Sequence, residues 1–301
     1  MNTDDRAERL DAVRRRREPP KFRQVAVRRV EVLGPRMVRV TLAGDDLAGF
    51  SVERPAASVR VLLPASGAEE LVIPAWNGNE FLLPDGRRPT IRTFTPRHLD
   101  AEALELVLDV VIHGSGPASE WAATAEPGAL VAVSGPGRGY AIASEAPSFL
   151  LVGDETAIPA INQLLEALAV EAQAIKAPAV EAQAVEALAV EAPAVEAPVP
   201  VQVHIEVAHP DARLPLPDHA QATVEWWDLP AGAPSGEALV QAVRDADLAP
   251  GTSVWAAGEA AAMQRIRRHL FDERGLPRSQ ATVRGYWKHG RMGDAEAAGD
   301  A

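Results

Sequence analysis

The sequence predicts two domains of different classes, an antiparallel β-barrel followed by an α/β domain built on a parallel sheet. The length of 301 residues is enough for two domains, since single domains commonly have about 100–200 residues. Short β-branched segments fill residues 22–144, and Gly, Pro or Asp separates them. From residue 148 onward, apolar strands alternate with helical patterns, which is typical of a parallel, doubly wound sheet.

The first domain follows a charged N-terminal arm, residues 1–21, that ends in Pro19 and Pro20. The Arg14 to Arg17 run in this arm fits a solvated segment better than a contact with an acidic partner. β-Branched runs then predict strands at 25–34, 37–44, 58–64, 70–74, 103–114 and 129–136. A short helix is expected at residues 119–124, just after Gly116 and Pro117. Short strands with turn residues between them favour a barrel or a sandwich.

The second domain is expected to cover residues 148–294, with residues 295–301 as a short tail. An apolar strand, a turn at Gly153 and a helix that ends near Leu168 open this domain. The segments at 201–210, 223–229, 236–248, 252–275 and 281–290 continue the alternation of strands and helices. The chain therefore has the pattern of a barrel joined to a nucleotide-binding fold.

A five-residue repeat of the form VEAxA interrupts the second domain at residues 170–199. Five residues do not match the helical period of about 3.6, so Val and Glu would rotate around a helix instead of forming one face. Pro178, Pro193 and Pro198 would also interrupt a helix. We therefore expect an expanded, partly extended linker inserted in a surface loop after the helix that ends near Leu168, and a tolerated insertion explains it more simply than a functional spacer.

Composition and charge exclude several classes of protein. The formal net charge is -12, so we expect no nucleic-acid partner. The Cys count is 0, which excludes disulfides, Cys-ligated iron–sulfur clusters and thiol nucleophiles. No segment reaches the roughly 18–20 uncharged apolar residues of a membrane span, and the charged N-terminus lacks the apolar core of a signal peptide. We expect a soluble, cytoplasmic protein whose acidic surface is compatible with a monomer.

The segment RPTIRTFTPR contains the first candidate binding residues, Arg92, Thr93, Phe94 and Thr95. An Arg, an aromatic ring and hydroxyls at a strand end suit a flavin dinucleotide. The guanidinium can pair with pyrophosphate, the ring can lie against the flavin, and hydroxyls or backbone N–H groups can bind its polar edge. A strand with an exposed Arg and a buried Phe gives the same pattern, so this motif needs support from elsewhere.

A second segment, DVVIHGSGPASEWA, supplies that support. A strand that ends at His113 is followed by a Gly-rich turn and a helix, whose N-terminal N–H groups form an anion site suited to the same pyrophosphate. The candidate residues are Asp109, His113, Gly116, Ala118 and Ser119. Metal ligation by His113 is disfavoured, because no second His, Asp or Glu has ligand spacing with it. A plain strand-end role for His113 stays open.

Two strand-to-helix turns of the second domain are candidates for a nicotinamide nucleotide, because open α/β sheets bind such ligands there. The first turn contains Gly153, Asp154, Thr156 and Ala157, and the second contains Gly258 and Glu259. Neither turn has the G-x-G-x-x-G form, so the dehydrogenase fingerprint does not apply. Arg265, Arg267 and Arg268 follow the second turn and could face a 2′-phosphate, although a solvated position is the simpler interpretation.

These motifs occur in the order found in the siderophore-interacting proteins, which the chain resembles over about residues 22–294 outside the repeat. That family is a branch of the ferredoxin-reductase-like flavoproteins and includes ferric-siderophore reductases. The resemblance rests on R-T-F-T from Arg92, on D-V-V-I-H-G and G-P-A-S-x-W-A between Asp109 and Ala122, on G-D-E-T-A-I-P-A from Gly153, on A-G-E from Ala257 and on G-Y-W-K-H-G from Gly285. Any one of these motifs is weak, whereas the whole set in the family's order is specific.

The resemblance implies an FAD-dependent oxidoreductase that reduces ferric siderophores. Members bind FAD in the barrel and accept electrons from NAD(P)H or, in some branches, from ferredoxin. Fe(II) fits hard oxygen chelators badly, so reduction releases the iron. By matching motif, FAD would contact Arg92, Phe94, Thr95, His113, Ala118 and Ser119, and the nicotinamide nucleotide would face Gly153 to Ala157 and Gly258. The central step needs no acid–base residue.

The C-terminal segment from Tyr286 to Arg291 places aromatic rings beside cations. Such a segment can cover a flavin or meet an anionic siderophore. Trp287 is therefore a candidate cofactor contact, with an anchoring role for the last strand as the alternative. Lys288 and Arg291 are the candidate substrate contacts.

The chain departs from the family pattern at three places. Phe94 stands where the family usually has Tyr, so ring stacking would survive while a phenol hydrogen bond is lost. The VEAxA repeat is extra, and it would adjoin a helix of the nucleotide domain. The run from Ala256 to Gly258 lacks the Cys common in the broader ferredoxin reductases, so the route of hydride transfer would differ in detail.

Two other functions stay open at this point. A non-enzymatic siderophore- or flavin-binding module would keep the fold without electron transfer, and a flavin reductase would use another acceptor such as a quinone, a dye or a partner protein. The donor, which is NADH, NADPH or a ferredoxin, and the type of siderophore stay open as well.

Overall fold

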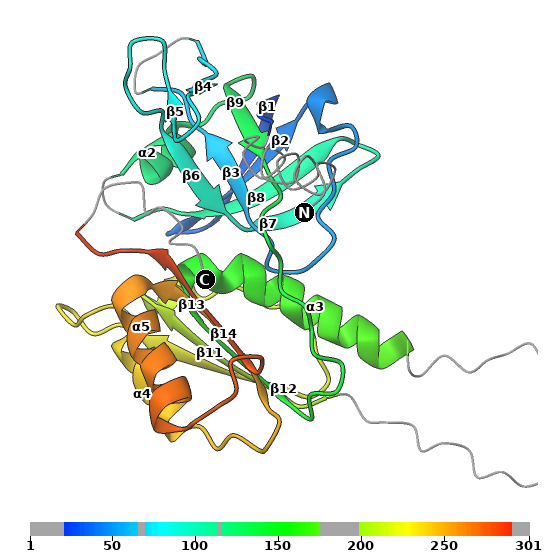
Figure 1. Cartoon of the computed structure of the whole chain (residues 1–301), viewed down its shortest axis with the longest axis vertical. Helices are drawn as coiled ribbons and strands as arrows, with labels where there is room; N and C mark the ends of the chain where they lie inside the picture. Colours follow the sequence, from blue (N-terminus) through cyan, green and yellow to red (C-terminus); the bar gives the residue numbers. More distant parts are fainter. Residues whose placement is uncertain (1–20, 66–69, 114–115, 175–198, 291–301) are drawn as a thin grey trace, which may run out of the picture.

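The computed structural model describes residues 21–65, 70–113, 116–174 and 199–290, and these form two parts that each contain one main sheet (Figure 1). The elements of the first part are β1 (Arg23–Gly34), β2 (Met37–Ala43), η1 (Asp45–Leu47), β3 (Val59–Leu62), β4 (Ala75–Trp76), β5 (Phe81–Leu82), β6 (Ile91–Phe94), β7 (Pro96–Asp100), β8 (Glu105–Val111), α2 (Pro117–Thr124) and β9 (Leu130–Ser134). The elements of the second part are β10 (Phe149–Asp154), η2 (Glu155–Ala157), α3 (Ile158–Ala174), β11 (Val201–Val207), η3 (Pro210–Ala212), β12 (Ala222–Asp228), α4 (Glu237–Asp245), β13 (Ser253–Glu259), α5 (Ala260–Arg268), η4 (His269–Glu273) and β14 (Ala281–Trp287).

In the described residues, the first part forms a seven-stranded antiparallel sheet in the order β6-β3-β9-β1-β2-β8-β7. The two edge strands, β6 and β7, are consecutive in the sequence, and only Thr95 separates Phe94 from Pro96. The sheet must therefore curl until its edges meet, which gives it the shape of a barrel. Its core is made of fully buried aliphatic side chains from five strands, such as Val40, Leu42, Val61, Leu108 and Val131.

The strand predicted at residues 70–74 is wrong. These residues form no strand, and the chain pairs only afterwards, where β4 and β5 make a small separate sheet. Val72 and Ile73 are each 45% exposed, so this apolar run has no core to cover. Pro74 has no N–H to donate to a ladder, which explains why pairing begins after it.

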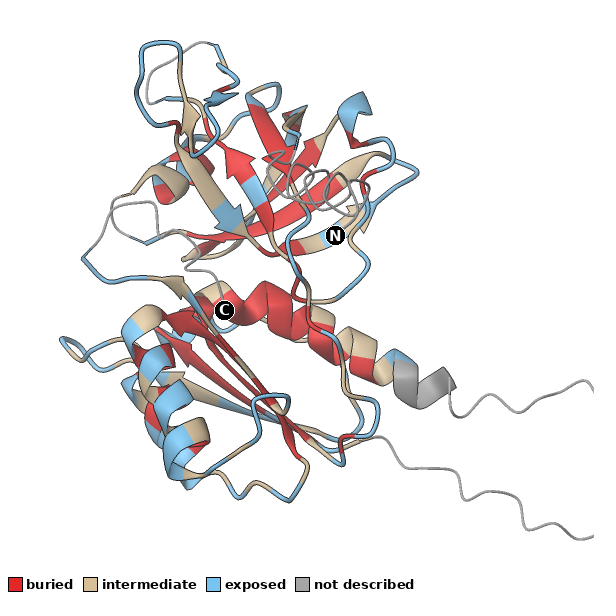
Figure 2. Cartoon of the chain, viewed as in Figure 1, coloured by how far each residue is buried: buried red, intermediate tan, exposed pale blue. Residues whose placement is uncertain are grey.

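The second part is a five-stranded parallel sheet in the order β12-β11-β10-β13-β14, as counted in the described residues. Every residue of the central strand β10 is buried, and Figure 2 draws the buried residues of this sheet in red, whereas the edge strand β12 has no buried residue. Strands covered on both faces are expected to be apolar throughout rather than alternating, which matches the sequence FLLVGD. Together with the first sheet, this confirms the predicted fold class.

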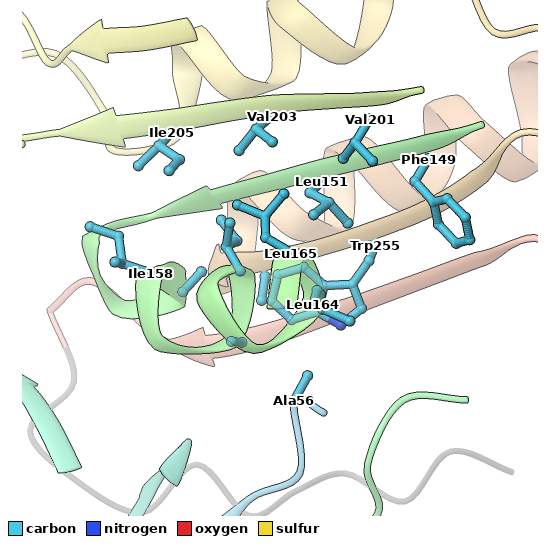
Figure 3. Packing of buried hydrophobic residues seen from close by; sticks show 14 of the residues in the cluster. Ala56, Phe149, Leu151, Ile158, Leu164, Leu165, Val201, Val203, Ile205 and Trp255 are labelled. Carbon is cyan, nitrogen blue, oxygen red and sulfur yellow. The ribbon is translucent and has the colours of Figure 1, made fainter. Parts of the chain in front are cut away.

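Alternate residues of β10 serve two different cores. Phe149 and Leu151 belong to the cluster that contains α3, whereas Leu150 and Val152 belong to the cluster that contains α4 and α5. Helices therefore cover both faces of the sheet, as in a doubly wound domain. Figure 3 shows the α3 side, where Leu164 and Leu165 pack against the sheet and Ala56 approaches from the first part.

Helix α3 ends at Ala174, beyond the predicted end near Leu168. The first unit of the repeat, residues 170–174, is thus helical, which corrects the expectation that the helix ends before the repeat. Its Ala, Glu and Gln residues favour helix, and no proline occurs between Pro159 and Pro178. Residues 175–198, which hold most of the repeat, lie outside the described residues, as do the Arg14 to Arg17 run and residues 295–301.

The two parts are joined by polar contacts in addition to the apolar core around α3. Tyr140 and Ser253 share a hydroxyl hydrogen bond of 2.7 Å, and the Gln163 side chain accepts from the N–H of Ala56 at 2.8 Å. The Arg284 guanidinium donates to the Ala56 carbonyl at 3.1 Å. These contacts fix the orientation of the parallel sheet toward the barrel. In the part of the chain that the structure describes, no helix has the length and apolar character needed to span a membrane.

Candidate functional site

The candidate site lies where the carboxyl ends of the parallel strands face the barrel. Ligands of open α/β sheets bind at this edge. Parallel pairing brings Asp154, at the end of β10, beside Glu206 near the end of β11. On the other side of β10, Gly153 pairs with Ala257 of β13, so the two predicted turns lie next to each other.

Asp154 holds these strand ends together. Its Oδ1 accepts from the backbone N–H of Thr156 at 2.9 Å and from the Thr156 hydroxyl at 2.5 Å. Its Oδ2 accepts from the N–H of Glu259 at 2.9 Å and from the indole Nε1 of Trp287 at 2.7 Å. One buried carboxylate thus connects β10, β13 and β14.

The glycines at this edge leave room for the close packing around Asp154. A Cβ at Gly258 would lie 2.6 Å from Oδ2 of Asp154, and a Cβ at Gly153 would lie 2.4 Å from the Cβ of Ala157. Real Cβ atoms do not approach other atoms so closely, so both positions need glycine. The structure therefore brings together Gly153, Asp154, Thr156, Ala157 and Gly258 as predicted, and it gives the glycines a packing role.

The helices that start at this edge are capped by the chain's own carboxylates. Asp154 caps η2, Oε2 of Glu259 accepts from Ala261 and Ala262 at the start of α5, and Oε1 of Glu206 accepts from the N–H of Gly236 just before α4. A helix N-terminus usually offers its N–H groups to a phosphate. Here carboxylates already occupy much of that capacity, which makes this edge acidic.

On the barrel side, β8 ends at Val111, two residues before His113. The strand predicted to reach residue 114 is therefore shorter than expected. Ser119 holds the following segment in place, because its Oγ accepts from the N–H of His113 at 3.1 Å. Gly116 is the N-cap residue of α2, and a Cβ there would meet nothing within 4 Å. Together with Ala118 in the first turn, these residues place the N-terminus of α2 near His113.

The residues of β6 lie on the edge strand of the barrel next to α2. The Phe94 ring is half-buried and lies 6.4 Å from the ring of Trp121 in α2. Arg92 is also half-buried, and its Nη1 donates to the carbonyl of Ile91 at 2.7 Å. Thr93 is exposed. Thr95 is buried and donates to the Tyr286 hydroxyl at 3.3 Å, which connects β6 to β14.

Asp109 has a different environment from the other candidates. It is buried within β8, and its two carboxylate oxygens accept from Arg39 of β2 at 2.7 and 2.9 Å. The side-chain hydrogen bond with Asp109 raises the pKa of Arg39. Asp109 therefore forms part of the barrel wall in this structure, and it is not brought together with the other candidates.

Trp287 joins the two halves of the site. Its ring stacks on that of His113 with centroids 6.2 Å apart and an angle of 27° between the planes. Lys288 follows it and is exposed at the rim. Arg291 lies outside the described residues. Arg265 forms an ion pair with Glu237, and Arg267 donates to the Val283 carbonyl, so neither is simply solvated.

A cavity of about 290 Å³ opens between these segments. Its lining includes Arg36, His113, Asp154, Glu155, Glu206 and Trp287. Two of these, Arg36 and Glu206, were not predicted, whereas Glu155 lies within the predicted range Gly153 to Ala157. Glu206 lies near the end of an apolar strand, so its position gave a signal in the sequence. Arg36 lies in the turn between β1 and β2, and no sequence pattern pointed to it.

The cavity contains an ion pair and further carboxyl groups. Arg36 donates from Nε to both oxygens of Glu155 at 2.9 Å, which pairs these two groups across the two parts of the molecule. Burial raises the pKa of Asp154, although its hydrogen bonds oppose the shift. Burial also raises the pKa of Glu206, and the nearby Asp154 raises it further. Besides the Arg36–Glu155 ion pair, the cavity thus includes the carboxyl groups of Asp154 and Glu206.

Chemically, this arrangement combines aromatic rings, an edge strand of the barrel sheet and a helix N-terminus on the barrel side. The opposite side offers carboxylates and small residues. The first set suits a planar cofactor with a phosphate group, and the second suits groups that donate hydrogen bonds.

Comparisons with known proteins agree with this geometry. The family model described as the siderophore-interacting FAD-binding domain matches residues 26–140, and the model described as siderophore-interacting protein matches residues 177–290. An uncharacterized protein of Mycobacterium tuberculosis, Rv2895c, is 33% identical over 288 residues, which are 90% of each chain. The ferric vibriobactin reductase ViuB of Vibrio cholerae is 27% identical over 89% of each chain.

Solved structures give the same relationship. A siderophore utilization protein from T. fusca matches with a TM-score of 0.72 and 33% identity, over 91% of this chain and 95% of that one. The siderophore-interacting protein SipS of Aeromonas hydrophila has a TM-score of 0.67 and 27% identity, over 90% and 93% of the two chains. Phthalate dioxygenase reductase, at 14% identity and a TM-score of 0.55 over 91% and 70%, shares the fold. The motifs, the two sheets and these matches over most of the chain place it in one family: it belongs to the siderophore-interacting proteins, with an FAD-binding domain of the ferredoxin-reductase-like fold.

Proposed function

We propose that the protein is a cytoplasmic, monomeric reductase of ferric siderophores that uses FAD and takes electrons from NAD(P)H or from a ferredoxin. The stacking of Trp287 on His113 carries this proposal, because it joins the barrel's binding motif to the carboxyl edge of the parallel sheet. The relative named ferric vibriobactin reductase supports the same chemistry. One NAD(P)H gives two electrons and each Fe(III) takes one, so one donor molecule reduces two ferric chelates.

The residues on the barrel side fit FAD by the chemistry of their groups. Phe94 offers a half-buried ring face, and β6 is an edge strand whose outer backbone groups can bind the polar edge of a flavin. Gly116 leaves open space over the N-terminus of α2, where Ala118 and Ser119 present N–H groups suited to pyrophosphate. Arg92 and the hydroxyls of Thr93 and Thr95 complete the proposed set, together with His113.

FAD, when bound, supplies the ability to accept a hydride and to give up its electrons one at a time. The chain's own residues would hold and shield the reacting partners. Trp287 would cover the site with its indole ring, whose plane is fixed by the hydrogen bond to Asp154. Asp109 would act indirectly by holding β8 to β2 through Arg39.

The donor and the acceptor would use the opposite side of the site. We propose that a nicotinamide nucleotide would lie along the turns with Gly153, Asp154, Thr156, Ala157, Gly258 and Glu259. The ferric siderophore would meet the rim at Lys288, with Arg291 as a second contact. Because donor and acceptor would share this side, we expect them to bind in turn rather than together.

Anaerobic absorbance spectroscopy tests the proposal. The protein is loaded with FAD and desalted, then mixed with NADPH, NADH or a reduced ferredoxin, and flavin bleaching is followed. A ferric siderophore is added next, with a ferrous-specific chromogenic chelator to detect Fe(II). Bleaching by one donor and reoxidation with Fe(II) release would support the reductase. Retained FAD with no bleaching by any donor would favour a binding module, and reoxidation only by quinones or dyes would favour another acceptor.

A further inference from the structure

We propose that the cavity at the carboxyl edge of the parallel sheet binds a primary ammonium group through Glu206. The preferred substrates would then be ferric chelates that carry a free amine. The statement about substrates rests on the proposed reductase function, whereas the ammonium site rests on the cavity itself.

Glu206 is a buried carboxylate with one free oxygen. Its side chain lines the cavity, and the residue is 3% exposed. Oε1 accepts from the N–H of Gly236 at 2.6 Å, and the N–H of Ala238 is also close enough to lower the pKa of the carboxyl, whereas Oε2 makes no hydrogen bond of ordinary geometry with the described residues. A buried, ionised oxygen without a donor is costly, and a ligand that donates to it removes this cost.

The other carboxylates of the cavity have their oxygens occupied. Both oxygens of Asp154 accept from the groups described above, and Glu155 accepts from Arg36 and from the N–H of Ala208 at 2.8 Å. Glu206 is therefore the group of the described cavity lining that retains a free carboxylate oxygen. One free oxygen is a poor site for Ca²⁺ or Mg²⁺, which need about six or more oxygen ligands. It suits a single N–H donor.

The charge around Glu206 favours a cation among the possible donors. Asp154 lies beside it on β10, and Glu237 follows on α4. The cation in the lining, Arg36, is paired with Glu155. Among the described residues, the lining also contains the imidazoles of His113 and His289. An anion would be repelled here, and an ammonium gains both the hydrogen bond and the charge attraction.

The position of the cavity connects this subsite to the proposed reaction. Trp287 and His113 line the cavity and also form the stack that bridges the site. An alkylamine arm that reaches Glu206 would therefore pass beside these rings and hold its chelate at the rim. The subsite would thus select substrates by binding an amine-bearing arm of the chelate that does not itself coordinate the iron.

Isothermal titration calorimetry with redox-inactive complexes tests the inference on the FAD-loaded protein. The probes are the gallium(III) complex of desferrioxamine B, a trihydroxamate with one terminal primary ammonium, and its N-acetylated form. We expect the amine form to bind about 10- to 100-fold more tightly, as expected for a hydrogen bond to a charged group. Glu206→Gln should abolish this difference, because Gln keeps an acceptor for Gly236 but has no charge.

Glu225→Gln is the matched control. Glu225 lies on the neighbouring strand β12, and its side chain is 61% exposed. Glu225→Gln therefore changes the net charge by the same amount as Glu206→Gln, but at a position outside the cavity. This variant should keep the preference for the amine form. Equal affinities of the two complexes for the wild-type protein would overturn the proposal without any variant, and so would a preference that survives in Glu206→Gln.

Pentylammonium and 1-pentanol separate this inference from the proposed function. If neither gallium complex binds, the substrate class is wrong, and the simple amine then decides whether the subsite exists. Saturable binding of pentylammonium, with none of 1-pentanol and none to Glu206→Gln, would support the ammonium site alone. No binding of pentylammonium would overturn it. Loss of Fe(III) reduction with intact amine binding would refute only the reductase proposal.

Discussion

Trp287 donates a hydrogen bond of 2.7 Å from its indole Nε1 to Oδ2 of Asp154, a residue 133 positions earlier in the chain. The same oxygen accepts from the backbone of Glu259, so the last strand is held to the central strand and to β13 through one atom. On its other side the indole stacks on His113 of the barrel part. The orientation of the ring that covers the site is thus set by a carboxylate of the parallel sheet.

Trp287→Phe should destabilise the protein by about 1.5–3 kcal/mol, the usual contribution of a hydrogen bond to a charged group. Phe keeps an aromatic ring but cannot donate to Asp154. The change in the free energy of unfolding is measured by urea denaturation. Combined with Asp154→Asn in a double-mutant cycle, the two changes should be strongly non-additive. Additive effects would mean that the hydrogen bond contributes nothing to stability.

Gly258→Ala should destabilise the protein by about 1–3 kcal/mol, which is the usual effect of overpacking. The new Cβ would lie 2.6 Å from Oδ2 of Asp154, and four donated hydrogen bonds hold that carboxylate in place. Gly116→Ala is the control, because Gly116 has a similar φ of 150° but open space at the Cβ position. Thermal unfolding measures the stability of both variants. If they lose similar stability, the loss comes from the backbone conformation and not from the contact with Asp154.

The parallel sheet could be predicted from the sequence because β10 and β13 are apolar runs followed by a turn and a helical pattern, and β12 precedes the helical pattern of α4. The barrel was harder to predict at its edges. β7 has the sequence PRHLD, which lacks β-branched residues, and pairing with β8 decides its conformation. The apolar run at residues 70–74 has the composition of a strand and no partner, so local propensity gave the wrong result there.

The candidate site could be predicted in part for the same reason. Residues within short motifs, such as Asp154 and Gly258, were found because the turn that holds them is local in sequence. Arg36 was not, since it meets Glu155 only after the two parts pack, and the two residues are 119 positions apart in the chain. Asp109 was found by its motif, yet the cross-strand Arg39 that binds it gives it a position in the barrel wall.

Phe94→Leu should weaken FAD binding by about 10-fold if the ring lies against the flavin, since an aromatic contact contributes about 0.5–1.5 kcal/mol beyond its area. Leu keeps an apolar side chain in the cluster that contains Phe94. Phe94→Tyr should retain FAD at least as well, because the ring face is unchanged. Affinity is measured by the quenching of flavin fluorescence on titration. Equal affinity of Phe94→Leu and wild type would exclude the stacking role.

Arg36 and Glu155 should be energetically coupled across the two parts of the molecule. Arg36→Ala leaves a buried carboxylate that retains the N–H of Ala208, and Glu155→Gln leaves a partly exposed guanidinium. A double-mutant cycle on unfolding free energy should give a coupling of about 0.5–3 kcal/mol. The exposed pair Arg87 and Asp85 is the control, and its coupling should be close to zero. Equal coupling of the two pairs would show that the contact between Arg36 and Glu155 has no special effect.

Glu206→Gln should become more stable relative to the wild type as the pH rises. The pKa of Glu206 is raised in the folded state by burial, with Asp154 and Glu237 adding to the shift. A raised pKa means that the folded protein holds the proton more tightly than the unfolded chain, whose Glu pKa is about 4.3. The stabilisation is complete below that value and is lost as the pH rises through the folded pKa, whereas Gln does not titrate. Unfolding free energies measured by urea between about pH 4 and pH 8 should therefore shift steadily in favour of the variant. A difference between Glu206→Gln and wild type that is constant with pH would mean that Glu206 has the same proton affinity in the folded and unfolded chain.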